Sequence, residues 1–269
     1  MKKLLVCTDF SKAGNNAAGY AALFAQQVKA ELMVVNFWNR NQFGFSAFND
    51  NHPSDFSQAS INMSGLVVDL RKLTNNQVLI NGSVHKSSFY NGLSATCKSY
   101  RPQLVLLGSQ ANNVHLGIFG SKSIYAGKNM KIPLVVVPVC YSYERIDRIG
   151  MASDLGKTIT DAVGCLKTLA RELNAVIHVL YAAPAGITDE KQFHEARQLV
   201  NLVGTENCYH SIASTNVDDD IMDYLAKQKV QLLAVIPRKH SFLTSLFYPS
   251  HTKHFIRYST IPVLVLRSL

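Results

Sequence analysis

Short apolar runs alternate with longer amphipathic stretches along the whole chain, a pattern typical of strands and helices that follow one another. The runs LLVC, LMVV, LVLL and LVVV carry hydrophobic residues at consecutive positions. Such runs suit strands that are covered on both faces, as in a parallel sheet between two layers of helices. The pattern therefore predicts a doubly wound α/β fold.

The first half of the chain is predicted to alternate strands with helices throughout. Its predicted strands are residues 3–7, 32–37, 77–84, 103–107 and 133–137. Its predicted helices are residues 13–29, 57–73, 87–100 and 121–129. The second half is predicted to repeat the strands at 148–152, 176–181, 208–213, 231–236 and 262–266.

The two halves of the chain resemble each other in sequence. Thr8-Asp9 has its counterpart in Ser153-Asp154, and the halves end alike in IPLVVVPV from Ile132 and IPVLVLRSL from Ile261. Self-similarity of this kind indicates the duplication of a unit of about 135 residues. We expect one domain over residues 1–141 and a second, degenerate domain over residues 142–269.

Nearly all of the net positive charge belongs to the first half, because acidic residues are few there. Residues 1–142 hold 13 Lys and Arg against 5 Asp and Glu, whereas residues 143–269 hold 14 against 13. A basic surface attracts nucleotides, nucleic acids or acidic lipids. Because no Lys/Arg-rich run with interleaved aromatic residues occurs, we do not expect nucleic-acid binding.

The apolar runs of the sequence are shorter than a signal peptide or a membrane span requires, so we expect neither. Thr8 and Asp9 end the first apolar stretch too early for a signal peptide, and no run of about 18 apolar residues occurs. The 5 cysteines form no CxxC pair and are odd in number, which suits reduced thiols. We therefore expect a cytoplasmic protein with no contact with membranes, no disulfide framework and no metal site.

Two polar loops of the first half are the candidate ligand site. TDFS follows the first predicted strand, and GSQANNVHLGIFGSKS follows the fourth. In doubly wound folds, ligands bind beyond the carboxyl ends of the strands, near the point where the strand order reverses. Free N–H groups and serine hydroxyls at the start of a helix suit an anion such as phosphate.

Over nearly its whole length the chain resembles a tandem universal stress protein. LLVCTDFSKAGNNAAGYAA resembles the first element of that family and PLVVVP its last. The loop between them is similar to the family's nucleotide signature: a glycine, two residues, a second glycine, nine residues, then glycine with serine or threonine. The resemblance implies two Rossmann-like, adenine-nucleotide-alpha-hydrolase-like sheets of five parallel strands that pair through their last strands as a pseudo-dimer.

The resemblance also implies a ligand, since some members of the family bind ATP and others bind no nucleotide. Carried onto this chain, it implies a nucleotide in the first domain only, with Mg²⁺ present only together with ATP. Asp9 would contact the adenosine portion, Val35 would lie near the adenine wall, and the remaining residues would face the phosphates. The implied binding residues are Asp9, Val35, Gly108, Gly120, Ser121 and Ser123.

The chain departs from the signature at several positions. Ala111 stands at the second glycine, and eight residues from Asn112 to Phe119 replace nine. A methyl group limits how closely the backbone approaches phosphate. In the second domain, Ile236-Pro237 and Pro249-Ser250 replace the glycine positions, and proline has no N–H to donate to phosphate. We expect no nucleotide in the second domain.

The site residues also have structural interpretations. Asp9 could cap the helix that follows it, Ser121 and Ser123 could cap another, and the two glycines could serve turns. An alternative function then follows: a non-nucleotide scaffold of the same family. Its basic loop at residues 238–257 and its long loop at residues 39–58 would bind a protein partner. Self-association of tandem chains is a further expected contact.

We do not expect an enzyme. Ser11 and Ser153 follow predicted strands, but no His/Asp arrangement accompanies either serine in a recognisable order. No paired carboxylates are positioned for a metal. The sequence therefore favours a stress-response regulator that binds an adenine nucleotide, with the scaffold as the alternative.

Overall fold

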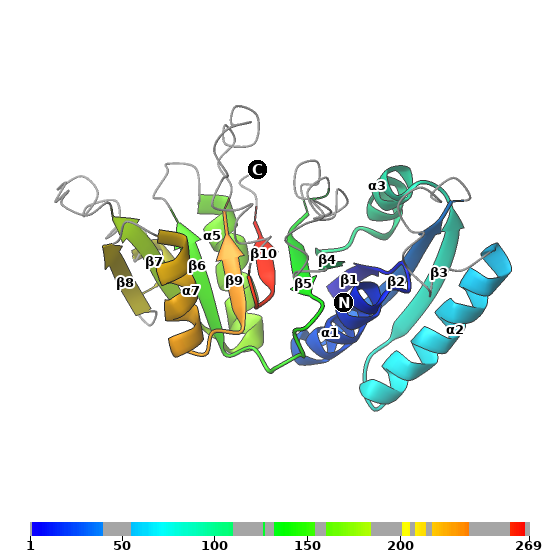
Figure 1. The fold of residues 1–269 in the computed structure, drawn as a ribbon, viewed down its shortest axis with the longest axis horizontal. Coiled ribbons are helices and arrows are strands. Elements are labelled where there is room, and N and C mark those ends of the chain that lie inside the picture. Colours follow the sequence, from blue (N-terminus) through cyan, green and yellow to red (C-terminus); the bar gives the residue numbers. More distant parts are fainter. Residues whose placement is uncertain are drawn as a thin grey trace. The chain divides into compact units, whose positions relative to one another are not determined.

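The chain forms two α/β units. The computed structural model describes residues 2–39, 55–109, 126, 132–153, 160–183, 201–204, 208–213, 217–236 and 259–266. Unit 1 is Met1–Tyr143 and unit 2 is Glu144–Leu269, so the boundary lies two residues beyond the predicted one. Each unit has a parallel sheet with helices, which confirms the predicted fold class (Figure 1). Pairing of the units through their last strands stays a prediction.

Strands and helices alternate along unit 1. Its strands are β1 (Lys2–Cys7), β2 (Ala30–Trp38), β3 (Ile80–Lys86), β4 (Leu104–Ser109) and β5 (Leu134–Pro138). Its helices with described bounds are α1 (Lys12–Val28), α2 (Phe56–Leu73) and α3 (Phe89–Tyr100). The strand order is β3-β2-β1-β4-β5, and all neighbours in it are parallel.

The third strand begins later than its predicted range of 77–84. Asn75 and Asn76 follow α2 in the left-handed region, with φ of 50° and 57°. Asparagine tolerates this conformation better than most residues, so a turn occupies these positions. As a result, β3 begins at Ile80 and runs on to Lys86.

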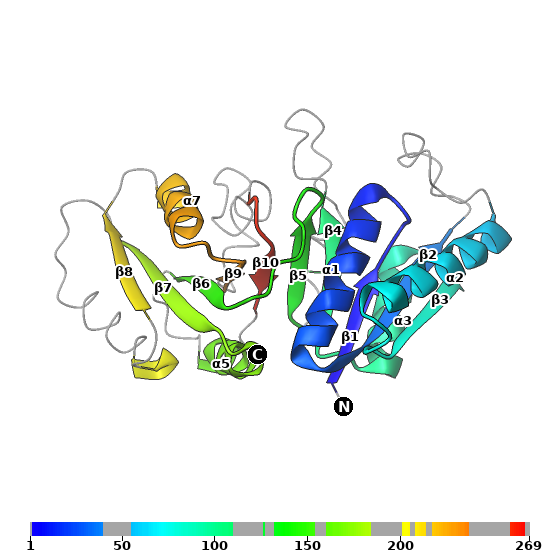
Figure 2. The same cartoon turned by 90° about the horizontal axis from the view of Figure 1, so that it is seen from below.

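Helices cover both faces of the unit 1 sheet. A Cβ added to Gly82 of β3 would meet Met63 and Val67 of α2, whereas one added to Gly92 of α3 would meet Phe37 of β2. Gly82 and Phe37 point to opposite faces, because side chains alternate along paired strands. Helices α1 and α2 lie side by side (Figure 2), and α3 covers the other face.

The central strands of unit 1 are buried on both faces, as the apolar runs predict. Side chains at consecutive positions are at most 2% exposed: Leu5, Val6, Val34, Val35, Val105, Leu106, Val135, Val136 and Val137. Burial of each such side chain contributes about 1.5–3 kcal/mol. The sheet is therefore a rigid support for the loops that leave its carboxyl edge.

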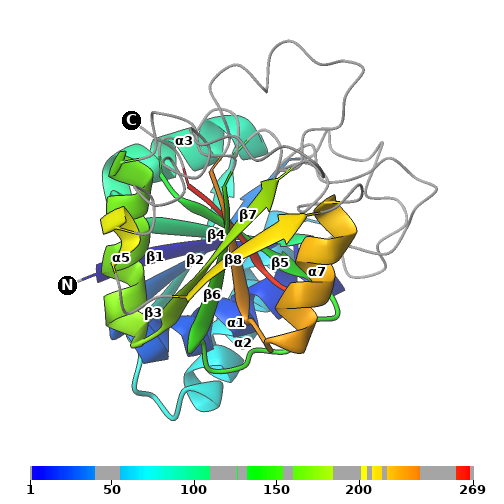
Figure 3. The ribbon, with the colours of Figure 1, turned by 90° about the vertical axis from the view of Figure 1, so that its left-hand side faces the viewer.

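Unit 2 repeats this arrangement. Its strands are β6 (Arg148–Ser153), β7 (Val176–Ala183), β8 (Cys208–Ala213), β9 (Leu232–Val235) and β10 (Val263–Val265). They are parallel in the order β8-β7-β6-β9-β10. Helices α5 (Thr160–Leu173) and α7 (Val217–Lys227) lie on opposite sides of the strands (Figure 3).

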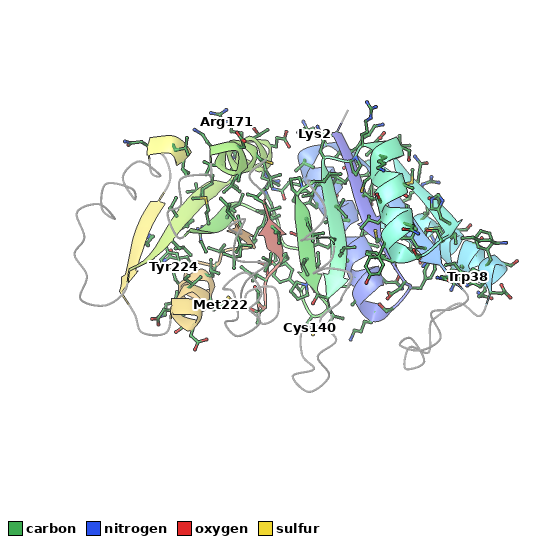
Figure 4. All side chains as sticks on the ribbon, turned by 90° about the horizontal axis from the view of Figure 1, so that it is seen from above. Lys2, Trp38, Cys140, Arg171, Met222 and Tyr224 are labelled. Carbon is green, nitrogen blue, oxygen red and sulfur yellow. The ribbon has the colours of Figure 1, made fainter. Side chains whose placement is uncertain are left out.

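A histidine is buried between the unit 2 sheet and α7. His178 of β7 is 6% exposed, and its Nδ1 lies 3.0 Å from Tyr224 Oη. Tyr224 lies on the side of α7 that faces the sheet (Figure 4). His210 of β8 stacks against His178 with ring centroids 6.4 Å apart. Burial lowers the pKa of His178, and the charges of His210 and Arg148 lower it further.

Unit 2 is expected to lose stability on acidification through His178. Burial favours the neutral ring in the folded state, while the unfolded chain binds a proton at the ordinary pKa of 6.5. The contribution is therefore present above that pH and is lost as the pH falls below it. Urea unfolding followed by circular dichroism at about pH 7.5 and about pH 5.5 measures the loss. His178→Gln should reduce the pH dependence; an equal dependence in both proteins would contradict it.

Candidate functional site

The candidate site lies at the carboxyl ends of β2, β1 and β4. From β1 the chain continues outward to β2 and β3, and it then returns through α3 to β4 on the other side of β1. The strand order therefore reverses between β1 and β4. Doubly wound sheets bind their ligands at this point.

Asp9 occupies the turn between β1 and α1, where Ser11 holds its carboxylate. The N–H and the hydroxyl of Ser11 donate to Asp9 Oδ1 at 3.1 and 2.5 Å. Ser11 Oγ in turn accepts the N–H of Gly14 at 3.1 Å and caps α1. Capping therefore falls to Ser11, and Asp9 is a half-buried carboxylate beside the helix N-terminus, where a negative charge is favoured.

Phe10 fixes the shape of this turn. Its φ is 62°, a left-handed conformation that is unfavourable for an aromatic residue. The Phe10 N–H donates to Thr8 Oγ1 at 2.9 Å, and the side chain is 4% exposed. The buried ring and the hydrogen bond hold the backbone in this conformation, and they thereby set the position of Asp9.

Gly108 marks a close approach between β4 and α1. A Cβ added there would lie 2.2 Å from the carbonyl oxygen of Ala13 and 3.0 Å from the Gly14 nitrogen. Gly108 is paired with Val137 of β5, so it belongs to the strand and not to a turn. Helix packing alone thus requires glycine here, and it brings the first turn of α1 against the end of β4.

Val35 lies in the core of the sheet, on the strand next to Asp9. Its side chain is fully buried, and its carbonyl accepts the N–H of Thr8 at 2.9 Å. It is paired with Cys7 of β1 and Ser83 of β3. The structure places Val35 below the carboxyl edge, and its role at an adenine wall stays a prediction.

The remaining sequence-predicted site residues lie outside the described residues: Gly120, Ser121 and Ser123, together with Ala111, Asp154 and Pro237. The same holds for the basic loop at 238–257 and for residues 40–54 of the long loop. Of the predicted binding residues, the structure brings the turn of Asp9, the strand end at Gly108 and the strand of Val35 to one part of the sheet.

Two polar residues at the same edge were not among the predicted site residues. Asn36 of β2 and Ser109 of β4 are 4% and 7% exposed. Asn36 Oδ1 and Ser109 Oγ have no hydrogen-bond partner in the part of the chain that the structure describes. Leaving a buried polar atom unpaired costs about 1–3 kcal/mol and is rare. The available sequence signal was the asparagine that interrupts the apolar run LMVVNFW.

Within the described ranges, no group of three or more His, Cys, Asp and Glu side chains is arranged to hold a metal ion. Asp9 is instead a single carboxylate engaged by Ser11. The described helices include none that is long and apolar enough to span a bilayer.

The model of the universal stress protein family matches the chain twice, at residues 1–138 and 145–267. A universal stress protein from Archaeoglobus fulgidus DSM 4304 superposes with a TM-score of 0.75 at 16% identity, covering 99% of this chain and 98% of that chain. A putative universal stress protein from Pseudomonas aeruginosa UCBPP-PA14 gives 0.65 at 13% identity, covering 99% and 93%. At these identities the likeness concerns the fold. No curated protein sequence matches the chain.

Gly108→Ala is expected to destabilise unit 1 by about 1–3 kcal/mol, because the new methyl group would overlap the backbone of Ala13. Gly65→Ala in α2 is the matched control, since an added Cβ meets nothing within 4 Å there. Urea unfolding followed by fluorescence of Trp38, the 1 tryptophan of the chain, reports on unit 1. Equal stability of the two variants would show that β4 and α1 are not in close contact.

Proposed function

Because the chain belongs to the universal stress protein family, with one match in each half, we propose that its unit 1 binds an adenine nucleotide. The protein would then act as a stress-response regulator whose contacts with partners depend on that binding. The observation that carries this proposal is the carboxyl edge of unit 1. Asp9 follows β1 there, and each of the two strands that flank β1 carries a buried, unpaired polar atom near its carboxyl end.

The chemistry of this edge supports a nucleoside beside Asp9. A carboxylate accepts hydrogen bonds from hydroxyl and amino groups and repels phosphate. Ser11 already donates to Asp9 Oδ1 through its N–H and its hydroxyl, which fixes the carboxylate. Ribose hydroxyls or base amino groups are therefore the ligand groups that suit Asp9.

The phosphates are assigned to the loop that leaves β4. Gly120, Ser121 and Ser123 of that loop would supply N–H groups and hydroxyls, as at other helix N-termini that bind anions. Mg²⁺, where it takes part, would be bound by the phosphates of ATP. This assignment rests on the sequence, because these residues lie outside the described residues.

Binding without catalysis is the role that we propose for the site. The hydroxyl of Ser11 donates a hydrogen bond to Asp9 and accepts one from the Gly14 N–H. Both hydrogen bonds of this hydroxyl therefore stabilise the turn. An activated nucleophile requires a base that takes its proton, and a carboxylate–serine contact within a helix cap does not provide this.

Unit 2 is proposed to bind no nucleotide. Ile236 follows β9 at the position that corresponds to Gly108, and Pro237 comes next. A branched side chain occupies the space that glycine leaves open, and proline offers no N–H. The cysteines with described side chains form no disulfide bond, which supports a location in the reducing cytoplasm: Cys7, Cys97, Cys140 and Cys165.

Isothermal titration of the full chain with ATP, ADP and AMP tests the proposal. We expect saturable binding of at least one of the three, near one nucleotide per chain. Asp9→Asn removes the charge with little change in shape and should weaken binding by about tenfold, while Asp69→Asn on the exposed face of α2 should leave it unchanged. Flat traces for all three nucleotides at millimolar concentration would contradict the proposal and favour the scaffold function.

A further inference from the structure

Asn36 is a buried amide at the carboxyl end of β2. It interrupts an apolar strand, and its side chain is 4% exposed. Asn36 Nδ2 donates to the backbone oxygen of Thr8 at 2.8 Å. Thr8 directly precedes Asp9, so this bond fastens the end of β2 to the turn that carries the candidate site.

The same hydrogen bond fixes the polarity of the Asn36 amide. Rotation by 180° would place Oδ1 against the Thr8 carbonyl, where two oxygen lone pairs would repel each other. Oδ1 therefore stays on the other side of the group and offers only an acceptor. It has no hydrogen-bond partner among the described residues.

Unpaired buried atoms are concentrated at this edge. The described part of the chain holds three: Tyr20 Oη, Asn36 Oδ1 and Ser109 Oγ. Tyr20 lies in the middle of α1, where its ring packs on Tyr141 and Tyr143. The other two lie near the carboxyl ends of β2 and β4, which flank β1 on its two sides.

Apart from Tyr20, the other buried polar side chains that the structure describes form hydrogen bonds within the protein. Each of the others that the structure describes takes part in a side-chain hydrogen bond: Thr8, Ser11, Thr74, His178, Gln231 and Ser259. Asn36 Oδ1, on a side chain that is bonded to the residue before Asp9, is therefore a costly exception that ligand binding would explain.

A ligand must bring a donor to Asn36 Oδ1, and an adenine nucleotide has two kinds. The ribose hydroxyls suit a carboxylate, which accepts from both at once, and Asp9 is placed for them. The exocyclic amino group is then the donor that remains. Hypoxanthine carries an oxygen at the same position, which a fixed acceptor repels.

We propose that Asn36 determines base specificity in unit 1: its Oδ1 accepts a hydrogen bond from the 6-amino group of adenine and disfavours 6-oxopurines. The inference rests on the proposed function of unit 1. It adds the residue that selects the base, and Asp9 then serves the ribose.

A base series on the unmodified chain is the first test. Titrations with ATP, inosine triphosphate and purine riboside triphosphate compare an amino group, an oxygen and a hydrogen at position 6 of the same scaffold. We expect ATP to bind at least about tenfold tighter than inosine triphosphate, with the purine nucleotide between them. Equal affinities for ATP and inosine triphosphate would overturn the role of Asn36 and leave nucleotide binding intact.

A variant pair locates the selectivity. Asn36→Ala should reduce the ratio of the two affinities to about one, mainly by weakening ATP binding, because the acceptor is gone. Asn81→Ala, on the exposed side of neighbouring β3, is the matched control and should keep the wild-type ratio. Thermal unfolding identifies the variants that fold. If Asn36→Ala does not fold, the base series on the wild-type chain tests the selectivity for adenine by itself.

Three outcomes would overturn the inference. An Asn36→Ala protein that folds and keeps the wild-type ratio would show that another group reads the base. If the effect of Asn36→Ala vanished with 2′-deoxy-ATP but persisted with inosine triphosphate, the donor would be a ribose hydroxyl. If no purine nucleotide bound, the proposed function would fail together with this inference. Equal binding of all bases would instead contradict this inference alone.

Discussion

The close packing of the first turn of α1 against the ends of β1 and β4 is the constraint on which the site depends. Gly108 permits it, since any Cβ would collide with the carbonyl of Ala13. Ser11 then caps the helix and holds the Asp9 carboxylate at 2.5 Å. In the sequence, Gly108 resembles the first glycine of a phosphate-binding loop. In the structure, this glycine allows α1 to pack against the sheet, and the candidate ligand site lies next to that contact.

Strands and their layering could be predicted because consecutive apolar residues leave few alternatives to a sheet buried on both faces. Asp9 and Gly108 could be placed at the carboxyl edge for the same reason. The local roles of these two residues could not be predicted. Ser11, and not Asp9, caps α1, and glycine is required at position 108 by its contact with Ala13. That contact joins segments about 95 positions apart, so only the packed structure reveals it. The role of Asn36 could not be predicted, because the sequence does not show whether the side-chain oxygen of an asparagine in a strand has a hydrogen-bond partner.

The two units share one architecture, but their described buried polar side chains differ in hydrogen bonding. In unit 2, the described buried polar side chains are satisfied internally: His178 by Tyr224, and Gln231 by backbone groups at residues 147 and 148. In unit 1, two acceptor-bearing side chains at the carboxyl edge remain unpaired.

Hydrogen exchange measured by mass spectrometry on the full chain, with and without ATP, tests this asymmetry most directly. The account predicts slower exchange after nucleotide addition in peptides that contain the ends of β1, β2 and β4, around Asp9, Asn36 and Gly108, and unchanged exchange in β6, β7 and β9. Protection of the unit 2 strands, or an absence of protection at the unit 1 edge under saturating nucleotide, would contradict it.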